Sequence, residues 1–267
     1  MWLTMARERR LRFGEVADLY DEVRPSYPPA LVDDVIALAP MSKPRRALEV
    51  GAGTGKATVL FAERGVQVHA LEPSAPMAAL AERNTAHLPG VTIERVEFES
   101  WDPRGAGFPL IISAQAWHWI SPDVGYAKAR TVLVSGGLLA AFWNRSDWDS
   151  CPFRDELAAA YRRAIPERAG EDPLHPAART APDHWDEWAS AVDATPGLDA
   201  AELRAYRWTR NYSTADYLAL LRTHSPNIVL EDAQRDLLLS EVGRVLDDQG
   251  GEFTLDYVCW LLLAHAS

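Results

Sequence analysis

The stretch 47-ALEVGAGTGKAT-58 runs from a short apolar segment through an acid into three glycines at alternate positions. Residues 45–50 are predicted to form a strand, and residues 55–64 carry apolar side chains at helical spacing, closed by Gly65 where a helix cap belongs. The chain therefore passes from strand to helix through a turn in which every second residue has no side chain. A ligand can approach the backbone closely at these glycines. This stretch predicts an α/β fold with a binding site at the glycine turn.

Strand and helix patterns alternate along the chain around this turn. The apolar run 109-PLIISA-114 is typical of a strand covered on both faces. Such alternation predicts a doubly wound, mostly parallel sheet with right-handed crossovers. Ligands of these sheets bind outside the carboxyl ends of the strands, where the glycine turn, Glu72 and the segments after Val96 and Ala114 are expected. The predicted strands are 66–72, around 91–96, 109–114 and 138–143, and the predicted helices are 76–86 and 122–134.

The pattern changes after Asn144. Two predicted helices, 155–165 and 183–192, are joined by a proline-bearing loop whose length is more typical of a lid or binding element than of a plain connection. A strand over 203–213, two helices and a final strand after Gly251 follow. We therefore divide the chain into cap helices with a binding core, a helical lid or substrate insertion, and C-terminal strands and helices that complete the sheet, over residues 1–144, 145–198 and 199–267.

The composition is that of an ordinary globular protein and disfavours several classes of function. The net charge of −11 argues against a nucleic-acid binder, because phosphate contacts need clustered Lys and Arg. Cys151 and Cys259 are too few for a disulfide framework, and no Asp, Glu and His cluster has metal-ligand spacing, so we expect no metal. Charged residues precede any long apolar run, and the apolar segment 257–266 is too short to span a bilayer, so we expect a cytoplasmic protein that does not bind membranes.

Three kinds of ligand compete for the glycine turn. A phosphate-binding loop for ATP or GTP needs two glycines five positions apart, followed by Lys and Ser or Thr, but Val50 stands five positions before Gly55 and Ala57 follows Lys56. A dinucleotide fingerprint needs a third Gly or Ala where this chain has Lys56 in one register and Thr58 in the other. The spacing therefore disfavours both a nucleotide triphosphatase and an NAD-dependent dehydrogenase.

The observed pattern, Glu49-x-Gly51-x-Gly53-x-Gly55, resembles the first motif of the class I S-adenosylmethionine-dependent methyltransferases. Their ligand has no phosphate and carries a positive sulfonium, so the turn needs close backbone approach rather than a lysine. The resemblance covers nearly the whole chain and implies a Rossmann-like fold with a seven-stranded sheet and S-adenosyl-L-methionine as the cofactor. Further stretches that resemble the small-molecule branch of this family, in the expected order, are 24-RPSYP-28, 96-VEFESWD-102 and 113-SAQAWHWI-120.

The resemblance assigns cofactor-binding roles around the turn. It places Glu49 at the amino end of the cofactor's methionine and Glu72 on both ribose hydroxyls, a bidentate role suited to a carboxylate. It places the adenine amino group on Glu97, with Glu99 as the rival carboxylate, and the adenine ring nitrogen on the backbone of Phe98. The predicted cofactor-binding residues are Glu49, Gly51, Ala52, Gly53, Gly55, Glu72, Pro73, Glu97, Phe98, Ser113, Gln115, Tyr20 and Arg24.

The resemblance also assigns an acceptor side. Either Tyr20 or Arg24 is expected to reach the carboxylate of the cofactor. His118 is the histidine that the motif places beside the methyl group, so it is the candidate general base, with a structural role as the other reading. Aromatic faces near a sulfonium gain cation–π attraction, although one of the two tryptophans after Ala114 is expected to be core. The predicted substrate residues are Trp117, Trp119, Tyr27, Arg222 and His224.

These residues imply an enzyme that transfers a methyl group to a small-molecule acceptor, including acceptors of secondary metabolism, and acts as a monomer or homodimer. The alternative is an enzyme of the same fold that binds the cofactor and catalyses a cyclisation or rearrangement without methyl transfer. A cofactor-binding protein without catalysis is a third reading. Methylation of nucleic acids is disfavoured by the acidic charge and by Ser-Ala-Gln-Ala over 113–116, where amino-group DNA methyltransferases have Asn-Pro-Pro-Tyr or Asp-Pro-Pro-Tyr.

Overall fold

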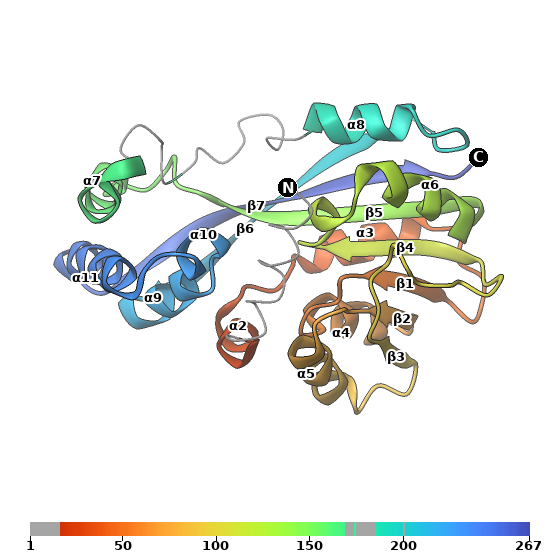
Figure 1. Ribbon diagram of the computed structural model, residues 1–267, viewed down its shortest axis with the longest axis horizontal. Coiled ribbons are helices and arrows are strands. Elements are labelled where there is room, and N and C mark those ends of the chain that lie inside the picture. The colour runs from red at the N-terminus through yellow and green to blue at the C-terminus, as the bar shows by residue number, and fades with distance from the viewer. Residues whose placement is uncertain (1–16, 169–173, 175–184, 200) are drawn as a thin grey trace.

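The computed structural model describes residues 17–168, 174, 185–199 and 201–267, and its centre is a seven-stranded sheet in the order β3-β2-β1-β4-β5-β7-β6 (Figure 1). Strands β1 to β5 pair in parallel, and β7 runs antiparallel between β5 and β6. This mostly parallel sheet confirms the predicted Rossmann-like fold. The strands are β1 (Arg46–Val50), β2 (Gln67–Leu71), β3 (Val91–Glu94), β4 (Phe108–Ala114), β5 (Leu133–Asp147), β6 (Glu202–Ser213) and β7 (Glu252–His265).

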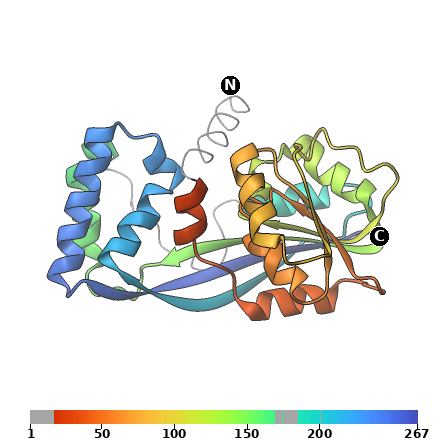
Figure 2. The ribbon, with the colours of Figure 1, turned by 90° about the horizontal axis from the view of Figure 1, so that it is seen from below.

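Strands β5, β6 and β7 are much longer than the others and continue beyond the parallel half. The pairing of β5 with β7 extends from Leu138 to Asp147, whereas the apolar pattern predicted only 138–143, because the outer part of β5 is polar. The projecting ends carry a helical lobe, and α2 (Ala17–Val23) lies between this lobe and the parallel half (Figure 2). The helical lobe consists of α7 (Arg154–Ala164), α9 (Thr214–Arg222), α10 (Ser225–Ile228) and α11 (Asp232–Asp248).

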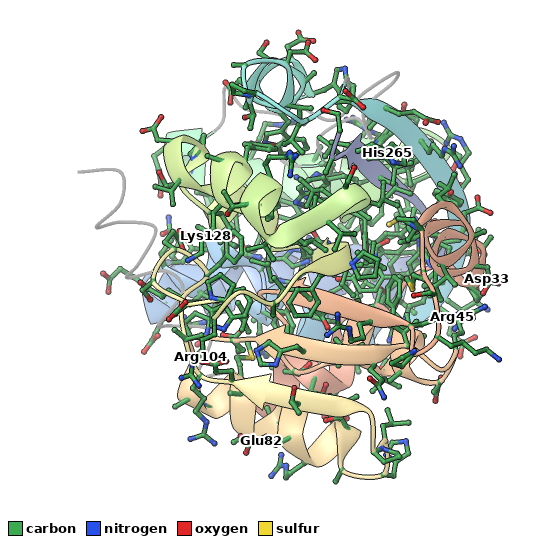
Figure 3. The ribbon with its side chains drawn as sticks, turned by 90° about the vertical axis from the view of Figure 1, so that its right-hand side faces the viewer. Asp33, Arg45, Glu82, Arg104, Lys128 and His265 are labelled. Atoms are coloured by element: carbon green, nitrogen blue, oxygen red, sulfur yellow. The ribbon has the colours of Figure 1, made fainter. Side chains whose placement is uncertain are left out.

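Helices cover both faces of the parallel half because its strands are apolar on both sides. On one face α3 (Pro29–Leu38) and α4 (Lys56–Ala62) pack against the sheet, and on the other α6 (Pro122–Val132) does so. α5 (Ala75–Thr85) flanks the edge strand β3. Charged side chains such as those of Glu82 and Arg104 stay on the outside (Figure 3). None of the helices in the described ranges is both long and apolar enough to cross a membrane.

The segment 145–198, expected as one insertion, contributes to both halves of the molecule. Its first helix, α7, packs against α11 in the helical lobe. Its second helix, α8 (Trp185–Asp193), packs beside α6, where Trp188 stacks on Trp143 of β5 with ring centroids 4.1 Å apart. Most of the predicted proline-bearing loop, including Pro173, Pro176 and Pro182, lies outside the described residues.

The helical lobe has a separate apolar core in which aromatic side chains pack among aliphatic ones. Tyr212 of β6 and Tyr257 of β7 are 2% and 5% exposed, and their hydroxyls hydrogen-bond each other at 2.8 Å. A buried hydroxyl is costly without a partner, so this pair joins the two strands beneath the lobe. Trp148, Tyr217 and Phe253 pack around it.

The Tyr212→Phe substitution is expected to lower the free energy of unfolding by about 1–3 kcal/mol, because it removes one of these buried hydrogen-bonding partners. The double substitution Tyr212→Phe/Tyr257→Phe is expected to cost less than the sum of the two single ones, since no hydroxyl then stays unpaired. Denaturant unfolding of the four proteins measures the coupling. Strictly additive losses would show that the two hydroxyls do not stabilise each other.

Candidate functional site

A cavity opens at the carboxyl ends of β1, β2 and β4, where the sheet changes its direction of winding. Its volume is about 1090 Å³, counted out to the solvent at its mouth. The four segments predicted to converge at this edge all contribute to its wall, together with the N-terminal segment. The wall is formed by residues within 20–27, 50–57, 71–77, 96–98 and 114–120.

Most of the residues that the sequence assigned to cofactor binding line this cavity. Glu49, Gly55 and Ser113 are exceptions, because they lie in the layer behind the wall. Sequence reasoning missed Thr54, Lys56 and Met77 as lining residues. Thr54 and Lys56 flank Gly55 in the motif, and Met77 follows the predicted Pro73 by about one helical turn. The predicted residues that line the cavity are Tyr20, Arg24, Gly51, Ala52, Gly53, Glu72, Pro73, Glu97, Phe98 and Gln115, together with the predicted substrate residues Tyr27 and Trp119.

The glycine turn brings bare backbone against the cavity. Gly51, Gly53 and Gly55 all have positive φ, which side chains rarely adopt. A Cβ on Gly51 would stand 2.4 Å from the Cβ of Ala116, so no side chain fits between the turn and the segment after β4. A Cβ on Gly55 would instead meet the backbone of α5 at 3.3 Å. The first two glycines therefore shape the cavity, and the third allows α4 to pack closely on α5.

Glu72 connects the end of β2 with the glycine turn. Its Oε2 accepts the backbone N–H of Gly53 and its Oε1 accepts that of Ser74, both at 2.8 Å. The side chain is nearly buried but lines the cavity. Because a carboxylate oxygen can accept more than one hydrogen bond, Glu72 on the cavity wall is suited to accept hydroxyl groups of a ligand.

Glu49 is a fully buried carboxyl behind the turn. Its Oε2 accepts the hydroxyl of Thr58 at 2.6 Å, and its Oε1 has no hydrogen-bond partner. Burial, with a smaller contribution from the charge of Glu72, raises the pKa of Glu49 to about 8, against the opposing effect of the Thr58 hydrogen bond. Glu49 therefore holds a proton at neutral pH in the free protein.

The two glutamates predicted as alternative partners of the adenine amino group, Glu97 and Glu99, lie in different places. Glu97 lines the cavity beside Phe98, whose ring is buried against Trp117. Glu99 does not line it, and its Oε1 accepts the backbone N–H of Ser121 at 3.3 Å. Lys128 lies over the ring of Phe98 at 5.4 Å and supports this part of the wall from behind. The position of Glu97 suits the adenine role better than that of Glu99.

The segment after β4 is held in an unusual backbone conformation. Gln115 has a φ of +57°, and its Nε2 donates to the carbonyl of Asn144 at 3.2 Å. The buried Ser113 donates its hydroxyl to the carbonyl of Val50 at 2.9 Å and so joins β4 to β1 below the cavity. Strained residues of this kind cluster at binding sites, where the surrounding structure keeps them in place.

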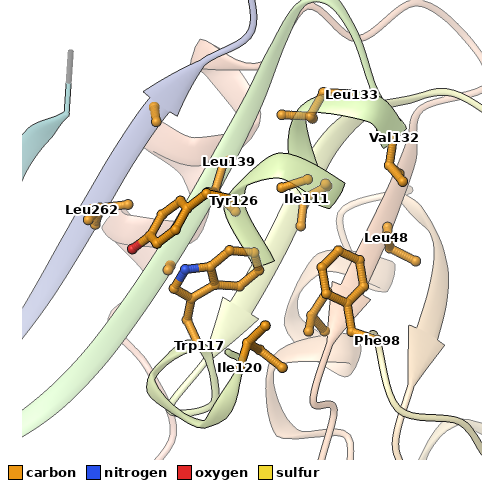
Figure 4. Close-up of a cluster of buried hydrophobic side chains, with 14 of the residues drawn as sticks. Leu48, Phe98, Ile111, Trp117, Ile120, Tyr126, Val132, Leu133, Leu139 and Leu262 are labelled. Atoms are coloured by element: carbon orange, nitrogen blue, oxygen red, sulfur yellow. The ribbon is translucent and has the colours of Figure 1, made fainter. Parts of the chain in front are cut away.

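The two tryptophans of this segment have different environments. Trp117 is 3% exposed and packs against Phe98 and Tyr126 in the apolar core (Figure 4). It does not line the cavity, so its position is that of a core residue rather than the predicted substrate residue. Trp119 does line the cavity, and its ring lies 4.7 Å from that of His118.

His118 is fixed by a buried tryptophan. The indole N–H of Trp143, which can only donate, lies 3.0 Å from Nδ1 of His118. Nδ1 therefore accepts this hydrogen bond, and the neutral ring carries its proton on Nε2. His118 does not itself line the cavity. A general base would have to gain a proton at Nδ1 and lose the Trp143 bond, so this arrangement favours a positioning role.

The N-terminal segment covers the cavity and connects the two halves of the molecule. Arg24 donates from Nε to the hydroxyl of Thr223 at 2.8 Å and from Nη2 to its carbonyl at 2.6 Å. Lys56, which follows the glycine turn, contacts Asp21 of α2 through its side-chain ammonium. Arg24 and Lys56 both line the cavity, and together they place two positive charges in an acidic protein.

The two predicted substrate residues of the C-terminal part lie outside the cavity wall. Arg222 is exposed at the end of α9, and His224 follows it, half-buried. Burial and the nearby charge of Arg24 lower the pKa of His224 to about 3, so this ring is neutral at physiological pH. Among the residues that the structure describes, no group of three or more His, Cys, Asp or Glu side chains could hold a metal ion.

Comparisons with known proteins agree with this geometry. Residues 47–137 match the family model described as a methyltransferase domain. The structure of a putative type II methyltransferase from Anaeromyxobacter dehalogenans superimposes with a TM-score of 0.63, at 23% identity, over 90% of this chain and 97% of that one. Residues 47–137 are therefore a methyltransferase domain, and the fold is that of the class I S-adenosylmethionine-dependent methyltransferases. This match confirms the resemblance seen in the motifs.

Relatives of this protein are found in bacteria and fungi. An uncharacterized methyltransferase of Mycobacterium tuberculosis is 36% identical over 146 residues, covering 53% of this chain and 55% of that protein. A probable S-adenosylmethionine-dependent methyltransferase of Saccharomyces cerevisiae is 28% identical over 154 residues, covering 54% and 50%. The chain therefore spans about half the length of these curated relatives. A Haemonchus contortus phosphoethanolamine N-methyltransferase, in complex with phosphomonomethylethanolamine and S-adenosylhomocysteine, shares the fold with a TM-score of 0.55 at 15% identity, over 95% of this chain and 57% of that one.

The Gly51→Ala substitution is expected to destabilise the protein more than Gly53→Ala. Both add a side chain at positive φ, which costs about 1–2 kcal/mol. Only Gly51→Ala also brings a methyl group against Ala116, and such overpacking adds about 1–3 kcal/mol. Denaturant unfolding without ligand measures both variants. Equal losses would mean that the close approach at Gly51 does not constrain the turn.

The proton on Glu49 makes the stability of the ligand-free protein depend on pH. Because the pKa of Glu49 is raised on folding, its contribution is fully present below the unfolded-state value of 4.5 and is lost as the pH rises through about 8. The stability of the wild type relative to Glu49→Gln is therefore expected to fall by roughly 1 kcal/mol per pH unit across this window. Denaturant unfolding of both proteins at several pH values measures the difference, and a constant difference would contradict a buried neutral Glu49.

Proposed function

We propose that this protein binds S-adenosyl-L-methionine in the cavity and transfers its methyl group to a small-molecule acceptor. The observation that carries the proposal is that one cavity joins the glycine turn, Glu72 and Glu97 in a single wall. The family match supports the cofactor, and the structural neighbour from Haemonchus contortus is described with S-adenosylhomocysteine. The proposed activity of the whole protein is supported by the cavity wall and by the family match together.

The polar groups of the cavity fit the parts of this cofactor. Glu72 offers a carboxylate on the cavity wall for the two ribose hydroxyls, and Glu97 offers one for the adenine amino group. Arg24 and Lys56 supply positive charge for the carboxylate of the methionine. Near the expected amino end, the buried Oε1 of Glu49 and the buried hydroxyl of Thr54 have no hydrogen-bond partner. Two such orphaned atoms beside the glycine turn are what a missing polar ligand would explain.

The chain's own residues would contribute mainly binding, alignment and exclusion of water. The cofactor supplies, when bound, a methyl group already activated by its sulfonium. The backbone from Gly51 to Gly53 and the segment from Ala114 to Ala116 form fixed walls that orient it. The α2 segment, through Arg24, separates the cavity from solvent on one side. His118 would position the acceptor side by holding Trp119 rather than act as a base.

A small-molecule acceptor suits the charge and shape of the site. The net charge of −11 would repel nucleic acids. Aromatic side chains of Tyr27 and Trp119 line the cavity and offer flat apolar surface next to the sulfonium. The segment 145–198 contributes helices on both sides of the sheet, and we propose that it encloses the acceptor as a lid.

Titration calorimetry with S-adenosyl-L-methionine, and separately with NAD, tests the cofactor. Micromolar binding of the first alone is the expected result, and it would be followed by a screen of small-molecule acceptors for release of S-adenosylhomocysteine. Binding of NAD alone, or no binding by folded protein, would overturn the proposal. Cofactor binding with product formation but no release of S-adenosylhomocysteine would replace methyl transfer by another reaction.

The Glu72→Ala substitution is expected to weaken cofactor binding by about tenfold or more, because hydrogen bonds to a charged group are worth about 1.5–3 kcal/mol. Glu63→Ala is the matched control, since Glu63 is exposed at the end of α4 and does not line the cavity. Calorimetry measures both dissociation constants, and thermal unfolding checks that each variant is folded. Equal affinities for the two variants would remove Glu72 from the site.

A further inference from the structure

Glu49 is surrounded by groups that do not balance a negative charge. From α4, Thr58 donates one hydroxyl to Oε2, and Oε1 has no partner. From the end of β2, Glu72 adds a like charge. From the segment before α3, the half-buried Tyr27 interacts electrostatically with Glu49 and with Cys259 of β7 through its phenol. The positive charge of Arg24 acts on Tyr27, whereas, beyond burial itself, the groups that shift the pKa of Glu49 are Thr58 and Glu72.

Ionising the Glu49 carboxyl in this buried position costs free energy. The carboxyl has lost water on both oxygens and receives a single hydrogen bond in return. Protonation removes the charge, and the raised pKa of Glu49 agrees with this geometry. At neutral pH the buried acid is thus a neutral group, and a positive charge that came close would favour its ionised form.

We propose that Glu49 is protonated in the free protein and ionises when the ammonium of S-adenosyl-L-methionine occupies the glycine turn, so that cofactor uptake releases a proton. This inference rests on the proposed function. The O–H bond of the Glu49 carboxyl breaks, its proton passes to the solvent, and the carboxylate that remains faces the ammonium of the ligand. No electron is transferred, and the released proton is the only other product.

The proposal makes cofactor affinity depend on pH through a single residue. Binding that releases a proton becomes tighter as the pH rises, by about tenfold per unit below the pKa of the free acid. The α-amino group of the ligand itself titrates near pH 8, so the measurement belongs at about pH 6 to 7, where that group stays charged. Burial lowers the pKa of Lys56, against the opposing effect of Asp21, so Glu49→Gln is measured beside the wild type to show the slope that remains without Glu49.

Calorimetry in buffers of different ionisation enthalpy counts the protons. At about pH 6.5 the wild type is expected to release about one proton with S-adenosyl-L-methionine or S-adenosylhomocysteine. 5′-Methylthioadenosine, which keeps the adenosine and the thioether but has no ammonium, is expected to release none. Glu49→Gln is expected to bind S-adenosyl-L-methionine without proton release and with less than a twofold change in affinity per pH unit.

Each outcome separates the two proposals. Binding of S-adenosyl-L-methionine without proton release, or equal release by 5′-methylthioadenosine, overturns the role of Glu49 and leaves the cofactor assignment standing. Equal proton release by wild type and folded Glu49→Gln also overturns it. Failure of the wild type to bind S-adenosyl-L-methionine overturns both. Proton release by the wild type with S-adenosyl-L-methionine, compared with that with 5′-methylthioadenosine, tests the role of Glu49 even if the Glu49→Gln variant does not fold.

Discussion

The close approach of two backbone segments, the turn at Gly51 and the segment that contains Ala116, determines the shape of the binding edge. The gap between them is too small for a side chain, so backbone forms the wall there. Ser113 bonds β4 to β1 directly below, and Gln115 holds its strained conformation against β5. The inner part of the cavity is therefore framed by backbone, while side chains form the rest of its wall.

The two glutamates beside the turn have the same side chain but differ in hydrogen bonding and in charge, because their surroundings differ. Glu72 and Glu49 stand at or near the ends of neighbouring strands. Glu72 accepts two backbone N–H groups at the cavity wall, whereas Glu49 accepts one hydroxyl in the interior. Charge is favoured where donors converge and disfavoured where they do not. One acid is thus suited to hold ligand hydroxyls, and the other is sensitive to a ligand's charge.

The sequence predicted the parallel half well because its signals are local. The glycine spacing, the apolar run before Ser113 and the helix caps each act within a few residues, and the structure follows them closely. The outer part of β5 was not predicted, because its polar residues form a strand only through pairing with β7. Trp117 and Trp119 could not be told apart, since a 3-10 turn directs one into the core and the other to the cavity. The bond from Trp143 to His118 joins residues that no periodic pattern connects.

The order of the strands has a consequence for how the protein is made. β7 is later in the chain than both of its neighbours, yet it lies between β5 and β6 and supplies the backbone pairing by which β6 joins the sheet. During synthesis, the glycine turn and the parallel strands emerge from the ribosome long before β7 does. Until then β6 has no partner strand, and Thr223, to which Arg24 donates two hydrogen bonds, is not held in position. The half that carries the glycine motif can form early, but its cover over the cavity must wait for a strand that comes much later in the chain.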